Sequence, residues 1–314
     1  MFFILLLKGF LIGIAFIIPG VSGGTLAIYL GVYQKLLNSI SSIFKDFKNS
    51  IKFLFPLFLG VAISVVLLAK LFSILLNWNS FVVLFFFIGL IAGGIKYIYN
   101  KALIKKYSLS IILSFAISFV VLLSIIIIEK TTTISGINYF SFDLLTYLLL
   151  IALGAIASIT MIVPGISGSA VLLVLGFYTA IVSNVVGNIL NLDSIVYNLQ
   201  VIIPFALGAL IGIIVFSRII NILLEKYPRE TYFAILGFIV ASIIGVFLEI
   251  KDPATAEIFS DQKPVFDNLI IFIGDNIWSV VGGLIALVCG FIGSRYLTKF
   301  DGGNKDAKNK KICN

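Results

Sequence analysis

Histidine is absent from the chain, and cysteine is nearly so, with Cys289 and Cys313 its two copies. Without histidine the protein lacks the commonest general base and a common metal ligand, which excludes most metal-dependent and hydrolytic chemistry. Charge is also scarce: 11% of the 314 residues are charged, against about 25% in an ordinary soluble domain. This is too little charge for a water-soluble surface. The net charge of +8 is gathered in short loops and the tail, so a nucleic-acid partner is excluded as well.

Long apolar runs fill the place of the missing charge, and 61% of the residues are apolar. A run of about 17–25 such residues is long enough to cross a bilayer. The chain has such runs at 2–18, 21–38, 53–76, 80–99, 109–128, 144–163, 166–187, 199–224, 231–249 and 268–294. The first run has no signal-peptide cleavage pattern, so we interpret it as a membrane segment of the mature chain. These runs predict an all-α polytopic membrane protein.

The chain contains an internal duplication. The run Pro19-Gly20-Val21-Ser22-Gly23-Gly24 returns 145 residues later as Pro164-Gly165-Ile166-Ser167-Gly168-Ser169, and seven of fifteen positions in 19–33 and 164–178 are identical. After a three-residue insertion the correspondence continues, so that Lys70 matches Arg218 and Gly89 matches Gly237. Matching prolines, glycines and basic residues do not arise from shared apolar composition, so we predict two related halves.

Loop charges predict that the two halves have opposite orientations, because cytoplasmic loops of membrane proteins are rich in Lys and Arg. Loops 34–52 and 95–108 and the tail are basic. We therefore predict that the protein lies in the cytoplasmic membrane, with these loops and both termini in the cytoplasm. Loops 129–143, 188–198 and 249–267 are predicted outside. The predicted organisation is repeat 1 at 1–130, an external linker at 131–143, an inverted repeat 2 at 144–298 and a disordered basic tail at 299–314. Each Pro-Gly turn then lies at the tip of a helical hairpin, which we expect to be re-entrant; ten full spans are the alternative.

The two turns are the candidate substrate site. A broken helix at membrane depth must be buried in protein or line a polar cavity. Ser or Thr after such a turn can cap the next helix, whose N–H groups then favour an anion. Inverted-repeat transporters place broken helices of this kind where the repeats meet. The alternative is that small residues in the turns only allow close helix packing. The candidate residues are Pro19, Gly20, Val21, Ser22, Gly23, Gly24 and Thr25 with Pro164, Gly165, Ile166, Ser167, Gly168 and Ser169.

Two basic residues inside apolar runs form a second candidate set. Lys70 and Arg218 occupy equivalent positions of the repeat, with the charge kept and the residue type changed. We expect Lys70 near the outer mouth of a central pathway and Arg218 near the inner mouth. The alternative is that both side chains extend along lipid to the headgroups. Lys8 has no charged equivalent, since its counterpart is Leu153, and is expected at the membrane interface.

With its two Pro-Gly-[Val/Ile]-Ser-Gly turns, inverted halves and Lys-rich loops, the chain resembles the polyprenyl-phosphate transporter family of bacteria and archaea. The resemblance extends to about residue 298 and is most specific at Pro19–Thr25 and Pro164–Ser169. It implies translocation of undecaprenyl phosphate, an anionic lipid carrier of envelope glycan synthesis, without covalent chemistry. It implies no cofactor and no metal. A coupling ion, H⁺ or Na⁺, stays open. The second turn has Ser169 and Ala170 where the first has Gly24 and Thr25, so the two turns need not bind equally.

Three other functions are compatible with parts of this pattern. A small-anion channel or exchanger could use the same helix N-termini. An undecaprenyl-diphosphate phosphatase can also have inverted re-entrant repeats, but that chemistry needs intramembrane carboxylates, and the turns contain none. A purely structural membrane protein would leave the duplicated polar turns unexplained. Release of phosphate from the diphosphate lipid separates the phosphatase from the transporter.

Overall fold

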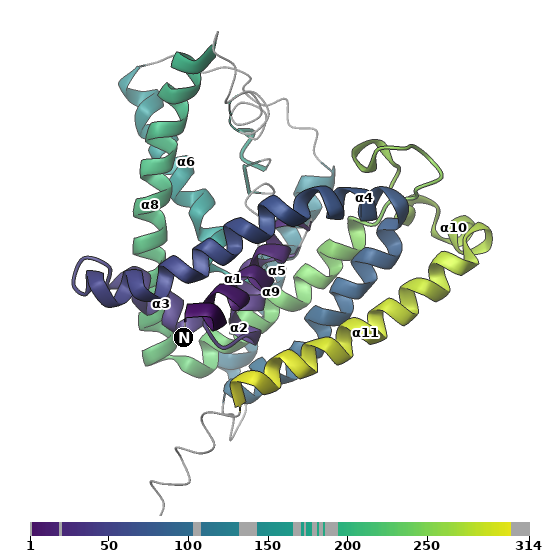
Figure 1. Cartoon of the computed structure of the whole chain (residues 1–314), viewed down its shortest axis with the longest axis horizontal. Coiled ribbons are helices and arrows are strands. Elements are labelled where there is room, and N and C mark those ends of the chain that lie inside the picture. Colours follow the sequence, from purple (N-terminus) through teal and green to yellow (C-terminus); the bar gives the residue numbers. More distant parts are fainter. Residues whose placement is uncertain are drawn as a thin grey trace, which may run out of the picture.

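The computed structural model describes residues 2–18, 21–102, 108–131, 143–165 and 194–302, together with 171, 172, 174–177, 181 and 185. Helices dominate these residues (Figure 1), and among them β-structure is limited to one isolated bridge between Lys251 and Pro264. The helices are α1 (Phe2–Ile17), α2 (Gly23–Tyr29), α3 (Tyr33–Ser41), α4 (Phe47–Lys101), α5 (Leu109–Thr131), α6 (Leu144–Ile162), α8 (Ile195–Lys226), α9 (Pro228–Leu248), α10 (Leu269–Asp275) and α11 (Ile277–Gly302), with 3₁₀ turns at Phe259–Asp261 and Val265–Asn268. Residues 132–142 of the predicted linker at 131–143, and residues 303–314 of the predicted tail at 299–314, lie outside the described residues.

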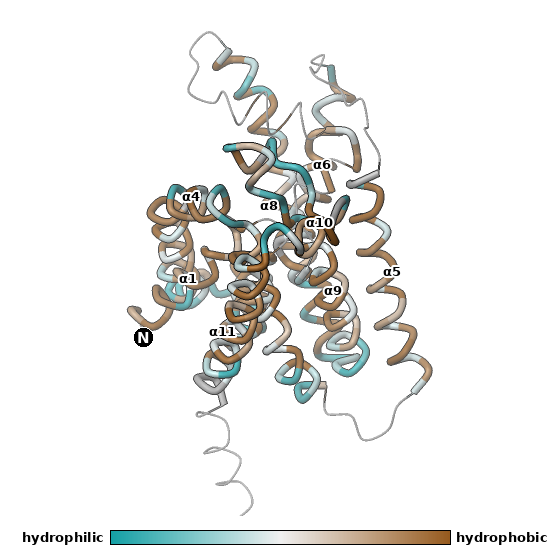
Figure 2. The backbone as a smooth tube through the Cα atoms, turned by 90° about the vertical axis from the view of Figure 1, so that its right-hand side faces the viewer, coloured by the Kyte–Doolittle hydropathy of each residue, from teal (hydrophilic) through white to brown (hydrophobic). Residues whose placement is uncertain are grey.

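Six helical segments are long and apolar enough to cross a membrane, which confirms a polytopic membrane protein. They are Phe47–Leu68, Lys70–Lys101 (which contains the break at Asn79 described next), Leu109–Glu129, Ile195–Lys226, Pro228–Leu248 and Ile277–Thr298. The helices are apolar along most of their length, and the hydrophilic residues gather at helix ends and connections (Figure 2). Their outer faces carry exposed large apolar side chains, such as Leu284, Ile285 and Val288 on α11. Such a surface is stable against lipid rather than water.

Helix α4 is two helices joined at a break. Asn79 has non-helical backbone angles (φ −162°, ψ 90°), and its side-chain oxygen accepts the N–H of Val82 at 3.1 Å. That bond caps the start of the second half of α4. Its amide nitrogen donates to Ser279 Oγ at 2.8 Å, which holds the break against the start of α11. The polar cluster at Asn77–Ser80 therefore marks a true break, as the spacing of apolar runs predicts.

The predicted segment 21–38 is not one helix, and here the sequence-based expectation is wrong. α2 ends after seven residues because Gly31 adopts a left-handed conformation (φ 69°). The Gly31 N–H donates to Ile28 O and the Val32 N–H donates to Ala27 O, both at 3.0 Å, which is the Schellman termination of a helix. Seven residues extend about 10 Å, whereas the hydrocarbon core is about 30 Å thick. α2 is therefore too short to cross a membrane by itself. The predicted run 268–294 is similarly divided between α10 and α11.

The same termination occurs in the second half of the chain, which supports the duplication. Gly176, the counterpart of Gly31, is also left-handed (φ 79°). The Phe177 N–H donates to Leu172 O at 2.9 Å, 145 residues after the bond between Val32 and Ala27. The repeated sequence Leu-Gly-x-Tyr therefore encodes a repeated helix stop.

Helix packing is duplicated as well. Gly9 of α1 lies against the carbonyl of Leu57 on α4, and its counterpart Gly154 of α6 lies against the carbonyl of Phe205 on α8. A Cβ at either glycine would overlap that carbonyl, so the helices approach more closely than any other residue allows. Each hairpin arm is thus fixed to the following long helix in the same way in both halves.

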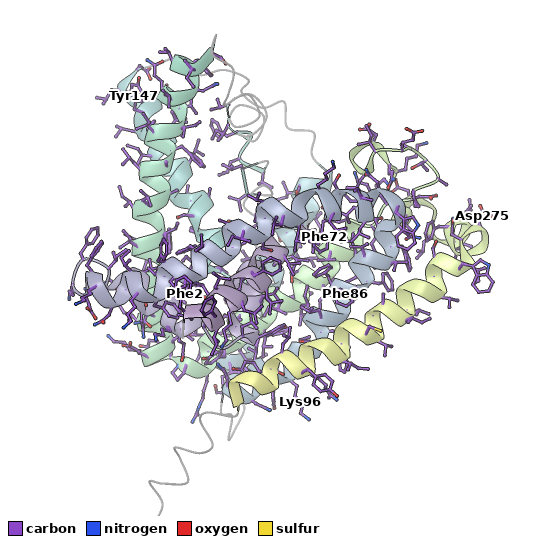
Figure 3. The ribbon with its side chains drawn as sticks, in the orientation of Figure 1. Phe2, Phe72, Phe86, Lys96, Tyr147 and Asp275 are labelled. Carbon is purple, nitrogen blue, oxygen red and sulfur yellow. The ribbon has the colours of Figure 1, made fainter. Side chains whose placement is uncertain are left out.

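The two halves interlock rather than lie side by side. The second part of α4 packs along α11, and its counterpart α9 packs along α5. Gly89 contacts the carbonyl of Leu287 on α11, and Gly237 contacts the carbonyl of Phe115 on α5. Lys96 and Asp275 lie at opposite ends of the pair formed by α4 and α11 (Figure 3). Each half therefore supplies its last helix to the other, and neither has a complete core of its own.

The opposite membrane orientation of the halves stays a prediction, and cysteine labelling tests it. Lys45 follows the first hairpin and Val196 follows the second, and both are exposed. After removal of Cys289 and Cys313, we expect Lys45→Cys to react from the cytoplasmic side and Val196→Cys from the outside. An impermeant maleimide applied to intact cells and to inverted vesicles measures this. Labelling of both positions from one side would contradict inverted repeats.

Candidate functional site

The first turn is buried in the protein interior. Val21, Ser22 and Thr25 are 9%, 8% and 1% exposed, and Gly23 and Gly24 are buried. Ser22 occupies the N-cap position of α2 with extended backbone angles, but its side chain makes no capping hydrogen bond. The expected capping role of Ser22 is therefore wrong. Its hydroxyl is not used to satisfy the N–H groups at the start of α2. Pro19 and Gly20 lie outside the described residues.

The second turn follows the end of α6. Val163 leaves the helix with extended backbone angles, and both Pro164 and Gly165 are buried. Gly165 is left-handed (φ 95°), and a Cβ there would lie 2.7 Å from the carbonyl oxygen of Phe238 on α9. Glycine is required at this position by conformation and by space alike. The remaining predicted residues of this turn, Ile166, Ser167, Gly168 and Ser169, lie outside the described residues.

The structure brings the two turns into contact. Gly24 of the first turn lies against Pro164 of the second, so closely that a Cβ on Gly24 would be 3.4–3.5 Å from three atoms of the proline. Tyr33, at the end of the first motif, donates its hydroxyl to the carbonyl oxygen of Ile162 at 2.7 Å, just before the second turn. Two segments 140 residues apart in sequence thus form one buried cluster at the junction of the halves.

Lys70 and Arg218 do not join this cluster. Both side chains are exposed, whereas the turn residues are buried. Lys70 has exposed apolar neighbours one helical turn away on either side, Val66 and Ile74. Arg218 likewise has exposed Val215 and Ile222 near it on α8. The structure therefore places both cations on apolar outer faces of long helices, where lipid lies in a membrane.

Sequence reasoning missed several polar contacts that hold the turns in place. Tyr33 is 3% exposed and was recognisable only as part of the repeated Leu-Gly-x-Tyr motif. Beside it, the Gln34 side-chain amide donates to the Tyr232 hydroxyl at 3.0 Å, which joins α3 to α9. Lys8 is half-buried, and its ammonium donates to the carbonyl of Leu30 at 2.6 Å, at the end of α2. These contacts join residues that are far apart in sequence, so no local sequence pattern predicts them.

We expect Tyr33→Phe to loosen the contact between the turns. The substitution removes the hydroxyl and leaves the buried Ile162 carbonyl without that partner, which destabilises a protein by about 1–3 kcal/mol. Thermal unfolding in detergent should show a lower midpoint for Tyr33→Phe. Tyr227→Phe is the matched control, because Tyr227 is exposed. Equal midpoints for the two variants would show that the Tyr33 bond contributes nothing to stability.

Comparison with known proteins identifies the family of the chain. The family described as undecaprenyl phosphate translocase-like matches residues 12–261, which include both turns. The chain belongs to this family. It is 32% identical over 248 residues to a polyprenyl-phosphate transporter of Staphylococcus aureus, covering 77% of this chain and 85% of the relative. It is 31% identical over 252 residues to a polyprenyl-phosphate transporter of Vibrio cholerae, covering 76% and 75%. No solved structure matches. The resemblance stated from the Pro-Gly turns is confirmed.

Proposed function

We propose that the protein moves a polyprenyl phosphate, undecaprenyl phosphate, across the cytoplasmic membrane, with the phosphate passing the paired turns. The observation that carries this proposal is the contact between Gly24 and Pro164, through which two duplicated polar turns share one buried site. Membership of the family and the names of the two relatives support the substrate. Transport needs no covalent step, so the protein acts as a carrier rather than an enzyme.

The physical problem in this reaction is the phosphate. Moving an unpaired charge into hydrocarbon is prohibitive, so polar donors must replace water along the whole path. The donors that we assign to this path are the backbone N–H groups of Gly23 and Gly24 at the start of α2, the hydroxyls of Ser22 and Thr25 in the first turn, and those of Ser167 and Ser169 in the second. The apolar chain needs no such path and can stay in lipid.

Lys70 and Arg218 fit an earlier step. A lipid substrate approaches from within the bilayer, so exposed cations on lipid-facing helices can meet its headgroup before it reaches the turns. We assign Lys70 to the outer leaflet and Arg218 to the inner leaflet. We place both termini in the cytoplasm. The proposal does not specify whether H⁺, Na⁺ or no ion is coupled to transport.

Purified protein in liposomes tests the proposal. A fluorescent polyprenyl phosphate is incorporated, and a membrane-impermeant quencher reports how much remains in the outer leaflet over time. We expect protein-dependent movement of the prenyl phosphate and none of a labelled phosphatidylserine. Movement of neither lipid, or phosphate release from the prenyl diphosphate, would contradict the assignment. Sulfate or chloride flux of the same size would favour an anion channel.

A further inference from the structure

A cavity of about 370 Å³ lies directly beside the second turn. We call it the α9 pocket, because one face of α9 forms its back wall. Its other walls come from α5, from α8, from Tyr33 of α3 and from the residues that follow α6. The lining includes Val163, Pro164, Ile220, Leu223, Ala234 and Phe238.

Four of the five polar side chains that line the α9 pocket are paired within the protein, and the fifth, Tyr227, is exposed. Ser114 donates to the carbonyl of Ser110, Thr231 to that of Tyr227, and Tyr33 to that of Ile162, at 2.7–2.8 Å. Glu230 accepts a hydrogen bond from the Ser110 hydroxyl at 3.1 Å. The pocket therefore presents carbon to a ligand. An anion would find few donors here, whereas an apolar chain would lose contact with water or lipid at no polar cost.

The α9 pocket begins at the site proposed for the phosphate. Pro164 lines the pocket and contacts Gly24, and the Phe238 carbonyl, at the same end, lies against Gly165. From Phe238 the wall continues along α9 to Glu230, eight residues or about 12 Å away. The polar turns thus adjoin the apolar pocket, just as the polar headgroup of a prenyl phosphate adjoins its apolar chain.

The pocket also adjoins the lipid-facing surface. Helix α5 packs along α9, and α8 contacts α9 over a shorter stretch. In the described part of the chain, α5 and α8 share no extensive interface with each other. Leu223 lines the pocket and is still 37% exposed on α8, and Ile112 and Leu113 are exposed on α5. A chain held in the pocket can therefore continue outward between α5 and α8 into the bilayer.

We propose that the α9 pocket binds the isoprene units next to the phosphate while the rest of the chain stays in lipid. This inference rests on the proposed function. The volume lies near the lower end of the range of small-ligand pockets, about 300–1,000 Å³. It therefore suits a short stretch of a branched chain and excludes the whole of a long one. Selection of the prenyl chain then occurs in the protein, not only at the headgroup.

Photocrosslinking tests this in the full-length, reconstituted protein. The probe is a prenyl phosphate with a diazirine on the isoprene nearest the phosphate, used in the same liposomes in which its movement is measured. We expect adducts on the α8 and α9 peptides that contain Leu223 and Ala234, reduced by excess unlabelled prenyl phosphate. Transport with adducts only elsewhere, or equal labelling by a diazirine phosphatidylcholine, would overturn the pocket but leave the function standing. Absence of transport would instead overturn the function itself.

A filling variant supplies a second test. Ala234→Phe places a ring in the α9 pocket, and we expect prenyl phosphate transport to fall about tenfold or more, since apolar pockets discriminate at that level for small changes of volume. Ala206→Phe is the control, because Ala206 is exposed on α8 and does not line the pocket. Equal transport by Ala234→Phe and Ala206→Phe at equal protein content would overturn the assignment.

Discussion

Gly24→Leu is expected to abolish prenyl phosphate transport while leaving the protein in the membrane. Gly24 faces the rigid ring of Pro164, and a Cβ added at Gly24 would lie 3.4–3.5 Å from the proline, in van der Waals contact. Leucine adds three further carbons beyond that Cβ at a buried position, so we expect the turns to be pushed apart. A displacement of about 1 Å in a preorganised site can reduce its rate about a hundredfold. The measurement is initial transport rate per reconstituted protein, together with the yield of folded protein.

Smaller substitutions at the same position make this prediction specific. Gly24→Ala adds only the tolerated Cβ, and Gly24→Ser reproduces the residue that the second half carries at Ser169, so both should transport at rates close to the unmodified protein. Gly293→Leu is the matched control, because no atom lies within 4 Å of the Cβ position of Gly293 on α11. A folded Gly24→Leu protein with full transport would show that contact between the turns is not needed for function.

The apolar runs and the polar residues between them predicted the long helices of this protein well. The break at Asn79 lies between the predicted apolar runs 53–76 and 80–99, whereas α9 begins at Pro228, three residues before the predicted run at 231–249. The end of α2 was not predicted, although Gly31 is visible in the sequence. Hydropathy measures only whether a segment can lie in an apolar environment. At Gly31 the helix ends because backbone N–H groups satisfy the last carbonyls of α2. This stop needs no polar side chain, so the apolar run continues across it.

The candidate site was predictable in its parts but not in its assembly. Duplication pointed to both Pro-Gly turns, and the behaviour of inverted repeats suggested that they meet. The contact between Gly24 and Pro164, the bond from Tyr33 to Ile162 and the α9 pocket depend on how α5 and α11 are exchanged between the halves. Such exchange is set by close glycine contacts between distant helices, which leave no periodic signal in a single sequence.

Neutralising Lys70 should weaken capture of substrate from the outer leaflet alone. A hydrogen bond to a charged group is worth about 1.5–3 kcal/mol, and about 1.4 kcal/mol changes affinity tenfold. Lys70→Met should therefore raise the lipid concentration needed for half-maximal uptake from the outer leaflet by about ten- to a hundredfold. Lys70→Arg should be tolerated, because the repeat has Arg218 at the equivalent position. The measurement is the concentration dependence of uptake in oriented proteoliposomes.

The exposed setting of Lys70 makes the alternative equally concrete. With Val66 and Ile74 exposed beside it, Lys70 could simply extend along lipid to the headgroups. In that case Lys70→Met would match the unmodified protein. Lys96→Met is the control, because Lys96 is also exposed on α4. Lys96 lies at the other end of the α4–α11 pair from Asp275 (Figure 3), next to the loop predicted in the cytoplasm. Its loss should therefore not change uptake from the outer leaflet. Arg218→Met should impair uptake from the inner leaflet only. Equal impairment of both leaflets by either variant would mean that the cations stabilise the fold or one shared site, and would remove them from the proposed path of the phosphate.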